Sequence, residues 1–345
     1  MATQRDAGAF KPAIQRLPTT PPPETPPATS RSIQVVDDLP VKKFVERKHL
    51  RTDQFEYERT GDDPGYILIF NQETFAELKT RRGTKRDVNE LVICLQRLGF
   101  NIEKENILTD QTTEEIKQVL TKVSNMDFTH YNCLILFFLS HGEELNFLFT
   151  KDGQILTKDI WLAFKDSKGL NNKPKMFVFQ ACKGENFTTV GNEPPKSSVL
   201  TPSSTFSPDI LYNDLLIVHS STEGNCAFRN TYTGSWFIQE LCKNFIAYGR
   251  KEEVISLIIR VTKCVSGNYY SNGTYPDTNI EYYNAKQMPF FISTLRKKFY
   301  LNRNKERDAI LRIAETNEDI LKILVQIKSQ LDTIFANEQE KKPKK

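Results

Sequence analysis

The sequence lacks the long apolar segments that place a chain in a membrane or direct it to secretion. No run of residues is apolar and long enough to cross a bilayer. The N-terminus also lacks the charged start, apolar core and small-residue cleavage site of a signal peptide. We therefore expect a soluble cytoplasmic protein with no membrane partner, and the nucleus is the alternative because the chain ends in KKPKK.

Cysteine is scarce, and the chain carries little net charge. The 6 cysteines form no C-x-x-C pair and lie mostly in apolar segments, which favours buried reduced thiols over zinc ligands or disulfides. The formal net charge is +4 and is spread along the chain, which argues against nucleic acid as a partner. We therefore expect no metal, no cofactor and no nucleic acid.

Residues 1–52 differ in composition from the rest of the chain. They have few apolar residues and are rich in proline, with LPTTPPPETPPATS at their centre. Such a segment favours extended conformations and buries too little apolar surface to offset the entropy of ordering. We expect a disordered segment, either a passive leader or a proline-rich docking tail.

Two apolar segments end in side chains that can react. Residues 133–139 (CLILFFL) indicate a buried strand that is followed by His141, and residues 176–179 (MFVF) indicate another that is followed by Cys182. Ligands bind at the carboxyl ends of the strands in an open parallel sheet. We therefore expect His141 and Cys182 to meet across one crevice, as base and nucleophile.

Strands and helices alternate along most of the chain, which predicts an α/β fold with a parallel sheet covered on both faces. Thr84 and Asp87 have the spacing of a capping box at the start of one helix. Asp152-Gly153 predicts a hairpin turn. The expected strands are residues 65–71, 100–108, 133–139, 176–179, 215–219 and 288–294. The expected helices are residues 85–98, 113–125, 158–165, 236–247 and 252–265.

The segments around the two reactive residues resemble the paired signatures of the caspases, the cysteine proteases that cut after aspartate. The sequence has SHGEE at His141 and QACKG at Cys182, with Lys183 where the signature has arginine, glutamine or glycine. The resemblance extends from Tyr57 to Tyr300. It implies a three-layer α/β/α fold with a six-stranded, mostly parallel central sheet, to which this chain adds a C-terminal helical extension.

The resemblance also implies roles for the site residues. Cys182 is the expected nucleophile and His141 its partner, while the backbone N–H groups of Gly142 and Cys182 form the oxyanion hole. Two guanidinium groups and one amide are expected to hold the substrate aspartate; they belong to Arg81, Gln180 and Arg229.

Residues 226–237 (CAFRNTYTGSWF) resemble the family's substrate-pairing strand, to which an extended peptide adds through main-chain hydrogen bonds. Cys226, Ala227 and Phe228 stand where the family commonly has tyrosine, serine and tryptophan. We therefore expect Phe228 to give the neighbouring subsite a different shape.

By the same resemblance, the chain divides into five segments: a prodomain (1–52), a large-subunit region (53–183), an intersubunit linker (184–209), a small-subunit region (210–301) and a helical tail (302–345). No aspartate occurs between Asp166 and Asp209, so the linker has no interior aspartate at which it could be cut. Four processing sites are therefore candidates, with Asp209 the leading one: Asp37, Asp38, Asp209 and Asp214.

The tail carries apolar residues at seven-residue spacing, as in the series from Ile313 to Ile334. This pattern fits a coiled coil that assembles copies or binds a partner helix, and it equally fits a helix packed on the protein's own body. In the family, the last strand pairs across a two-fold dimer, so we expect a homodimer. Other expected partners are protein substrates, other caspases and inhibitors.

A rival interpretation is a non-catalytic homologue that regulates active caspases by dimerising with them. Lys183, the altered subsite segment and the linker without aspartate favour this decoy. The presence of His141 and Cys182, together with the three pocket residues, favours an enzyme. We predict a caspase-like cysteine endopeptidase that cuts proteins after aspartate, in apoptosis or a related proteolytic pathway.

Overall fold

The computed structural model describes residues 55–184, 212–271, 285–302, 313, 316–317 and 319–330, and the backbone of residues 3–5 and 188–189. Most of the predicted prodomain, linker and tail lies outside these residues, as do Asp37, Asp38 and Asp209. Among the described residues, no helix is long and apolar enough to span a membrane.

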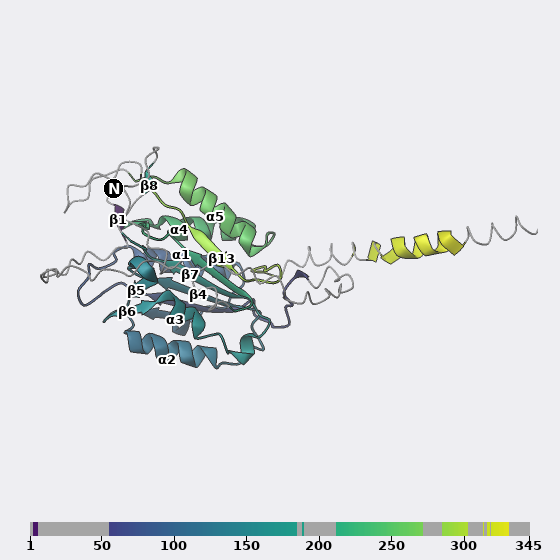
Figure 1. Cartoon of the computed structure of the whole chain (residues 1–345), viewed down its shortest axis with the longest axis horizontal. Helices are drawn as coiled ribbons and strands as arrows, with labels where there is room; N and C mark the ends of the chain where they lie inside the picture. The colour runs from purple at the N-terminus through teal and green to yellow at the C-terminus, as the bar shows by residue number, and fades with distance from the viewer. Residues whose placement is uncertain are drawn as a thin grey trace, which may run out of the picture.

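A six-stranded sheet forms the middle of the molecule (Figure 1). The strands lie in the order β13 (Phe290–Ser293), β9 (Leu215–His219), β7 (Lys175–Gln180), β4 (Leu134–Leu139), β2 (Tyr66–Asn71) and β3 (Ile107–Thr109). The strands from β9 to β3 pair in parallel, and the edge strand β13 is antiparallel to β9. The predicted six-stranded, mostly parallel sheet is confirmed.

Helices cover both faces of the sheet, and the alternation of side chains along β4 shows why. Ile135 and Phe137 lie in the core shared with α1 (Thr84–Arg97), α4 (Trp236–Tyr248) and α5 (Val254–Asn268). Leu136 and Phe138 lie in the core on the other face, with α2 (Thr113–Ser124) and α3 (Thr157–Leu162). A strand buried on both faces is apolar throughout, as the sequence of β4 is. The three-layer fold is confirmed (Figure 1).

Smaller sheets surround the main one. The predicted hairpin at Asp152-Gly153 joins β5 (Phe147–Phe149) to β6 (Gln154–Leu156). A three-stranded sheet has the order β1 (Thr3–Arg5), β10 (Phe228–Asn230) and β11 (Gly234–Ser235). A two-stranded sheet pairs β12 (Ala285–Lys286) with β8 (Thr188–Thr189).

The capping box predicted at the start of α1 is wrong. Gly83 is the N-cap, with φ 90°, and the Thr84 hydroxyl instead donates to Asn71 at 2.5 Å. The carboxylate of Asp87 accepts hydrogen bonds from the backbone N–H and hydroxyl of Ser235, at 2.7 and 2.6 Å. A tertiary partner has therefore replaced the local cap, and it joins α1 to the start of α4.

The strand predicted over residues 100–108 is also wrong over most of its length. Only its end belongs to β3, and residues Lys104–Asn106 form a turn of 3-10 helix. The side chain of Asn106 explains the turn, because it accepts from the Glu103 N–H at 2.8 Å and donates to the Ile67 carbonyl at 2.9 Å. A side chain that bonds to nearby backbone competes with the strand ladder.

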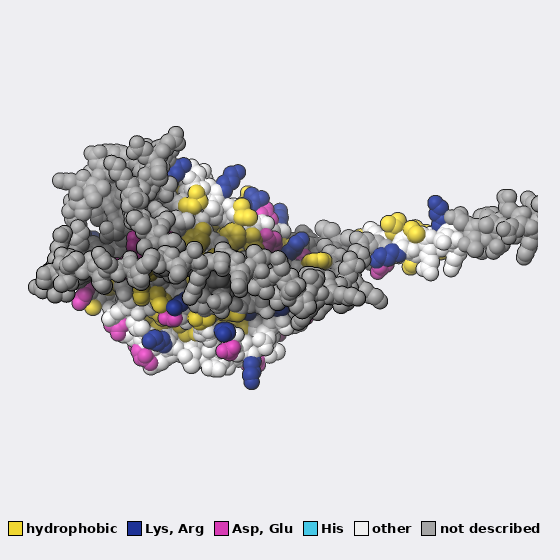
Figure 2. All heavy atoms as spheres, in the orientation of Figure 1, with side chains coloured by type: hydrophobic (Ala, Val, Ile, Leu, Met, Phe, Trp, Pro, Cys, Tyr) yellow, Lys and Arg dark blue, Asp and Glu magenta, His cyan; other side chains and the backbone are white. Residues whose placement is uncertain are grey.

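The tail forms a helix over residues 319–330, where every side chain is exposed. Its apolar residues include Leu321 at 63% exposure and Leu324 at 56%. Figure 2 shows apolar side chains on the surface of this helix. Over this stretch, the expectation of a helix packed on the protein's own body is not met.

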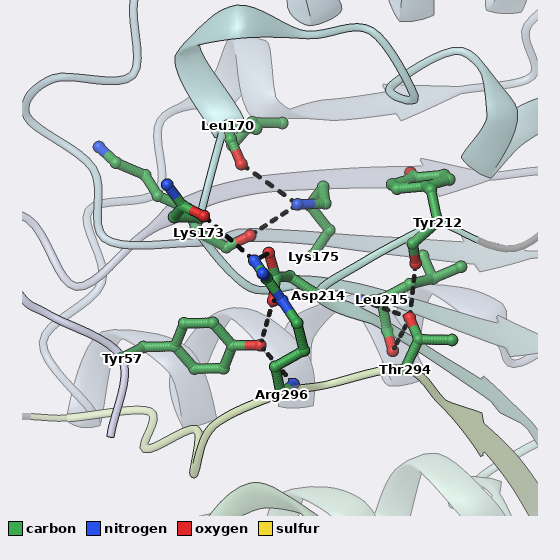
Figure 3. Close-up of polar contacts among 10 residues, drawn as sticks. Tyr57, Leu170, Lys173, Lys175, Tyr212, Asp214, Leu215, Thr294 and Arg296 are labelled. Atoms are coloured by element: carbon green, nitrogen blue, oxygen red, sulfur yellow. Dashed lines mark hydrogen bonds and ion pairs between the residues drawn. The ribbon is translucent and has the colours of Figure 1, made fainter. Parts of the chain in front are cut away.

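A cluster of polar side chains lies at the N-terminal ends of the parallel strands (Figure 3). The carboxylate of Asp214 accepts from the Tyr57 hydroxyl at 2.7 Å and from two nitrogens of Arg296, at 2.9 and 2.6 Å. Nearby, the ammonium group of Lys175 donates to the carbonyls of Leu170 and Lys173. We call Tyr57, Lys175, Asp214 and Arg296 the Asp214 cluster. Its members come from four segments that are distant in the sequence.

Candidate active site

The ends of β4 and β7 meet, as the sequence predicted. The Ser140 N–H, just after β4, donates to the Gln180 carbonyl at the end of β7, at 3.1 Å. Two residues further along each of these two segments, the backbones lie so close together that a Cβ on Gly142 would lie 2.2 Å from the Cys182 carbonyl oxygen. Only glycine fits such an approach without a backbone shift.

His141 is held in a defined tautomer. Its Nε2 lies 2.8 Å from the Lys79 carbonyl oxygen, and because a carbonyl can only accept, Nε2 carries the proton. Nδ1 then bears the lone pair, and within the described part of the chain it has no hydrogen-bond partner. The ring is 1% exposed and packs on Phe75, with centroids 4.8 Å apart.

The imidazole of His141 is neutral at physiological pH. Burial, followed by the positive charge of Arg81, lowers the pKa of His141 to about 3, and the bond to Lys79 opposes this only in part. The unprotonated Nδ1 is the atom that can accept a proton, while the same burial disfavours the protonated ring.

Cys182 is buried against the segment that precedes β10. Its Sγ accepts a hydrogen bond from the Ala227 N–H at 3.0 Å and lies 3.5 Å from the Ala227 carbonyl oxygen. Phe228 packs in the same small apolar cluster and stacks on Trp236 at 4.7 Å. An N–H donor aimed at sulfur is the kind of contact that stabilises a thiolate.

Two guanidinium groups are buried beside this pair. Arg81 and Arg229 are both 0% exposed. Arg81 donates to the Gln72 carbonyl at 3.1 Å and the Thr84 hydroxyl at 2.9 Å, and Arg229 donates to the Arg82 carbonyl at 3.0 Å. These bonds fix the planes of both groups.

Arg81 also acts electrostatically on the reactive residues. Burial lowers the pKa of Arg81 to about 10, while the charges of Asp87, Cys182 and Glu73 favour its protonated form. The group therefore stays charged at neutral pH. Burial raises the pKa of Asp87 to about 6, and Ser235 rather than Arg81 holds its carboxylate.

Lys183, the residue that departs from the cysteine signature, pairs with a carboxylate that is not part of the pocket described above. Its ammonium group forms an ion pair with Glu223 at 3.1 Å and lies 4.8 Å from the centre of the Phe290 ring. Burial lowers the pKa of Lys183, and Glu223 opposes this shift. Lysine is therefore accommodated here by a carboxylate and an aromatic face.

Comparison with known proteins identifies the family. The model described as "Caspase domain" matches residues 64–300, which is more than half of the chain. The chain belongs to the caspase family.

Curated caspases match over most of their length. Caspase-1 of Drosophila melanogaster is 32% identical over 239 residues, covering 68% of this chain and 73% of that protein. Caspase-6 of Mus musculus is 32% identical over 259 residues, covering 71% and 91%. The crystal structure of caspase-1 from Spodoptera frugiperda matches with a TM-score of 0.63 at 28% identity, covering 75% of this chain and 98% of that one.

The caspase family is one of cysteine peptidases, so this chain is a caspase-like cysteine protease, and the decoy interpretation is not favoured. The structure brings the segments of His141, Gly142 and Cys182 together, and it buries Arg81, Gln180 and Arg229 completely. Among the described residues, no cluster of three or more His, Cys, Asp or Glu is arranged to hold a metal.

Sequence reasoning missed two backbone groups of the site. The Lys79 carbonyl orients His141, and the Ala227 N–H contacts Cys182. Backbone groups are present at every residue, so their roles leave no mark in residue type. The proximity of residue 79 to His141 follows only from the fold.

Proposed function

We propose that this chain hydrolyses peptide bonds after aspartate, with Cys182 as nucleophile and His141 as general base. The observation that carries the proposal is the neutral His141 ring, whose lone pair lies on Nδ1 at the edge of the sheet where Cys182 also lies. A thiol and an adjacent imidazole form the usual pair for acyl transfer through sulfur.

The reaction proceeds in two steps. Nδ1 of His141 takes the Sγ proton as sulfur attacks the carbonyl carbon, and the N–H groups of Gly142 and Cys182 stabilise the oxyanion. Collapse of the tetrahedral intermediate breaks the C–N bond, and His141 returns the proton to the leaving amine. Water then hydrolyses the thioester, which frees the acid and regenerates the thiol.

Charge selects the substrate. Arg81 and Arg229 present two fixed positive groups, and the amide of Gln180 ends β7 beside Cys182. A short carboxylate satisfies two guanidinium groups through charge-assisted hydrogen bonds. Phe228 lines the neighbouring subsite, where its stacking on Trp236 leaves a flat apolar wall.

The five segments predicted from the sequence remain our proposal for the organisation of the chain. We also propose that the chain is processed at aspartates that precede or follow the core. Asp37, Asp38 and Asp209 are candidates, and Asp209 leads at the linker. Asp214 is disfavoured, because its side chain is buried and held by Arg296. Mass spectrometry of autoprocessed protein tests this ranking: fragments unchanged in Asp209→Ala would exclude Asp209.

Family membership supports protein substrates and dimerisation, and we propose a homodimer joined through β13. This strand is the edge of the main sheet, and Phe291 is only partly buried there.

The exposed tail helix would assemble further copies or bind a partner helix, and other caspases and inhibitors are further partners. We propose a cytoplasmic or nuclear location and a role in cell death. Light scattering of a chain truncated at residue 301 tests the tail: an unchanged mass would remove its assembly role.

An aspartyl fluoromethylketone probe tests the proposed activity. It should label the wild-type chain at Cys182 and leave Cys182→Ala unlabelled, with a glutaminyl fluoromethylketone as the matched control reagent. Equal labelling of both variants, or equal reaction with both reagents, would contradict the proposal.

A further inference from the structure

The N-terminal strand of the chain lies on the strand proposed to bind substrate. β1 pairs antiparallel with β10, with Thr3 opposite Asn230, Gln4 opposite Arg229 and Arg5 opposite Phe228. β10 pairs on its other side with β11, so β1 completes a three-stranded sheet. An extended segment that adds to an open strand edge is a common way to bind a peptide.

The register of this pairing points at the thiol. Residue numbers fall along β10 as they rise along β1, so the next position of this register on β10's side is Ala227. Ala227 is the residue whose backbone N–H and carbonyl contact Sγ of Cys182. A peptide that continued this register by one residue would therefore reach the proposed nucleophile.

Residue 6 is an aspartate, and it is the only acidic residue among the first ten. It lies outside the described residues. Aspartate is also the residue type that the pocket of Arg81, Gln180 and Arg229 takes under the proposed function, on which this inference rests.

The other leader aspartates lack this support. Asp37 and Asp38 fall in the sequence IQVVDD, and within the described part of the chain the pairing on β10 belongs to residues 3–5. The structure therefore favours the first aspartate of the chain over these two.

We propose that residues 3–6 (TQRD) are an internal substrate that occupies the chain's own cleft and is cut after Asp6. Hydrolysis consumes one water, breaks the bond between Asp6 and Ala7, and leaves a carboxylate on Asp6 and a new amino terminus on Ala7. Before the cut, the tethered segment competes with other substrates at a high effective concentration. After the cut, the short peptide leaves and the groove opens.

Intact-mass measurement of a full chain with a C-terminal tag tests the cut. We expect wild type to lose the residues up to Asp6 at a fractional rate that does not change on tenfold dilution, because the segment is in the same chain. Asp6→Ala should keep these residues, whereas the matched Asp37→Ala/Asp38→Ala variant should lose them as wild type does. A rate proportional to concentration, or an uncut wild type, would overturn the proposal.

Peptide binding tests occupancy without turnover. In Cys182→Ala, where the segment stays uncut, a fluorescent acetyl-TQRD-amide should bind at least about tenfold more weakly than in the double variant with Asp6→Ala. Equal affinities would overturn the docking of the segment.

A reporter peptide with aspartate before the scissile bond separates the two proposals. Hydrolysis of the reporter by Asp6→Ala, together with an uncut wild type, would refute the internal substrate alone. Absence of reporter hydrolysis by every variant would refute the proposed function.

Discussion

The two ends of the central parallel strands differ in how their buried charges are paired. At the end where the strands begin, the Asp214 cluster sets one carboxylate against Arg296 and a tyrosine hydroxyl. At the end where they finish, Arg81 and Arg229 bring two positive groups into the interior near Cys182. In the first arrangement the carboxylate is paired within the protein, which stabilises the fold, while we propose that the second receives an acidic ligand.

The same contrast appears in the titratable groups. Burial alone would raise the pKa of Asp214, but hydrogen bonds from Arg296 and Tyr57 outweigh it and lower the pKa. At the other end, burial dominates and lowers the pKa of His141 to about 3. One end therefore holds its carboxylate charged, and the other holds its base neutral.

Removing the nucleophile should have the largest effect, and only at the catalytic end. Cys182→Ala should lower kcat by at least about 1000-fold, because no other group can form the acyl intermediate. The midpoint of thermal unfolding should stay within about 2 °C of wild type, since alanine keeps a small apolar side chain. Turnover of an aspartyl peptide and calorimetry measure the two quantities. Substantial turnover by the variant would exclude Cys182 as the nucleophile.

Altering the charged pocket should come next. Arg229→Gln should lower kcat/KM for an aspartyl peptide by about 100-fold or more, because a charge-assisted bond to the carboxylate is lost. Arg229→Lys should fall between this variant and wild type, since it keeps the charge without the planar fork. Steady-state kinetics with one substrate suffice. Equal losses for both variants would show that the charge itself contributes little.

Adding one methyl group where the two strand ends meet should have a moderate effect. Gly142→Ala places a Cβ 2.2 Å from the Cys182 carbonyl oxygen, so the backbone must shift. A displacement of this kind should lower kcat/KM by about 100-fold. Gly267→Ala on α5 is the control, because a Cβ there meets nothing within 4 Å. Activity losses of similar size in both variants would contradict the close approach.

The Asp214 cluster should show the reverse pattern, with a loss of stability and little loss of activity. Asp214→Asn should lower the free energy of unfolding by about 2 kcal/mol at pH 7 and leave kcat/KM within about twofold. The folded-state pKa of Asp214 is below its ordinary value, so its contribution is complete above about pH 4 and is lost as the pH falls further. The difference from wild type should therefore shrink below pH 4. Urea unfolding at several pH values measures it, and a difference independent of pH would contradict the ion pair.

Much of the sheet was predictable because burial on both faces leaves an unbroken apolar run, as in β4 and β7. The close approach of the segments that carry His141 and Cys182 was predictable for a related reason: parallel strands present their carboxyl ends on the same side of the sheet. Arg81 and Arg229 were predicted from the family resemblance alone, because residue type does not distinguish an arginine buried in a site from one exposed to solvent.

Other features depended on long-range partners that local patterns do not contain. Asp87 lies at the spacing of a helix cap, yet it is bonded by Ser235 from another element. Asn106 helps to form a 3-10 turn just before β3, within the predicted strand, through its bond to the Ile67 carbonyl. β1 pairs with β10, which lies more than 220 residues later in the sequence. Nothing in the composition of residues 3–5 indicates a strand.

The most direct test of the catalytic end is the ratio of kcat/KM for two peptides that differ only in aspartate or asparagine before the scissile bond. Asparagine has nearly the same shape and no charge, so the ratio isolates the two guanidinium groups. The wild-type enzyme should prefer aspartate by at least about 1000-fold. A preference of less than about threefold would contradict a cleft built from a thiol, an imidazole and two buried positive charges.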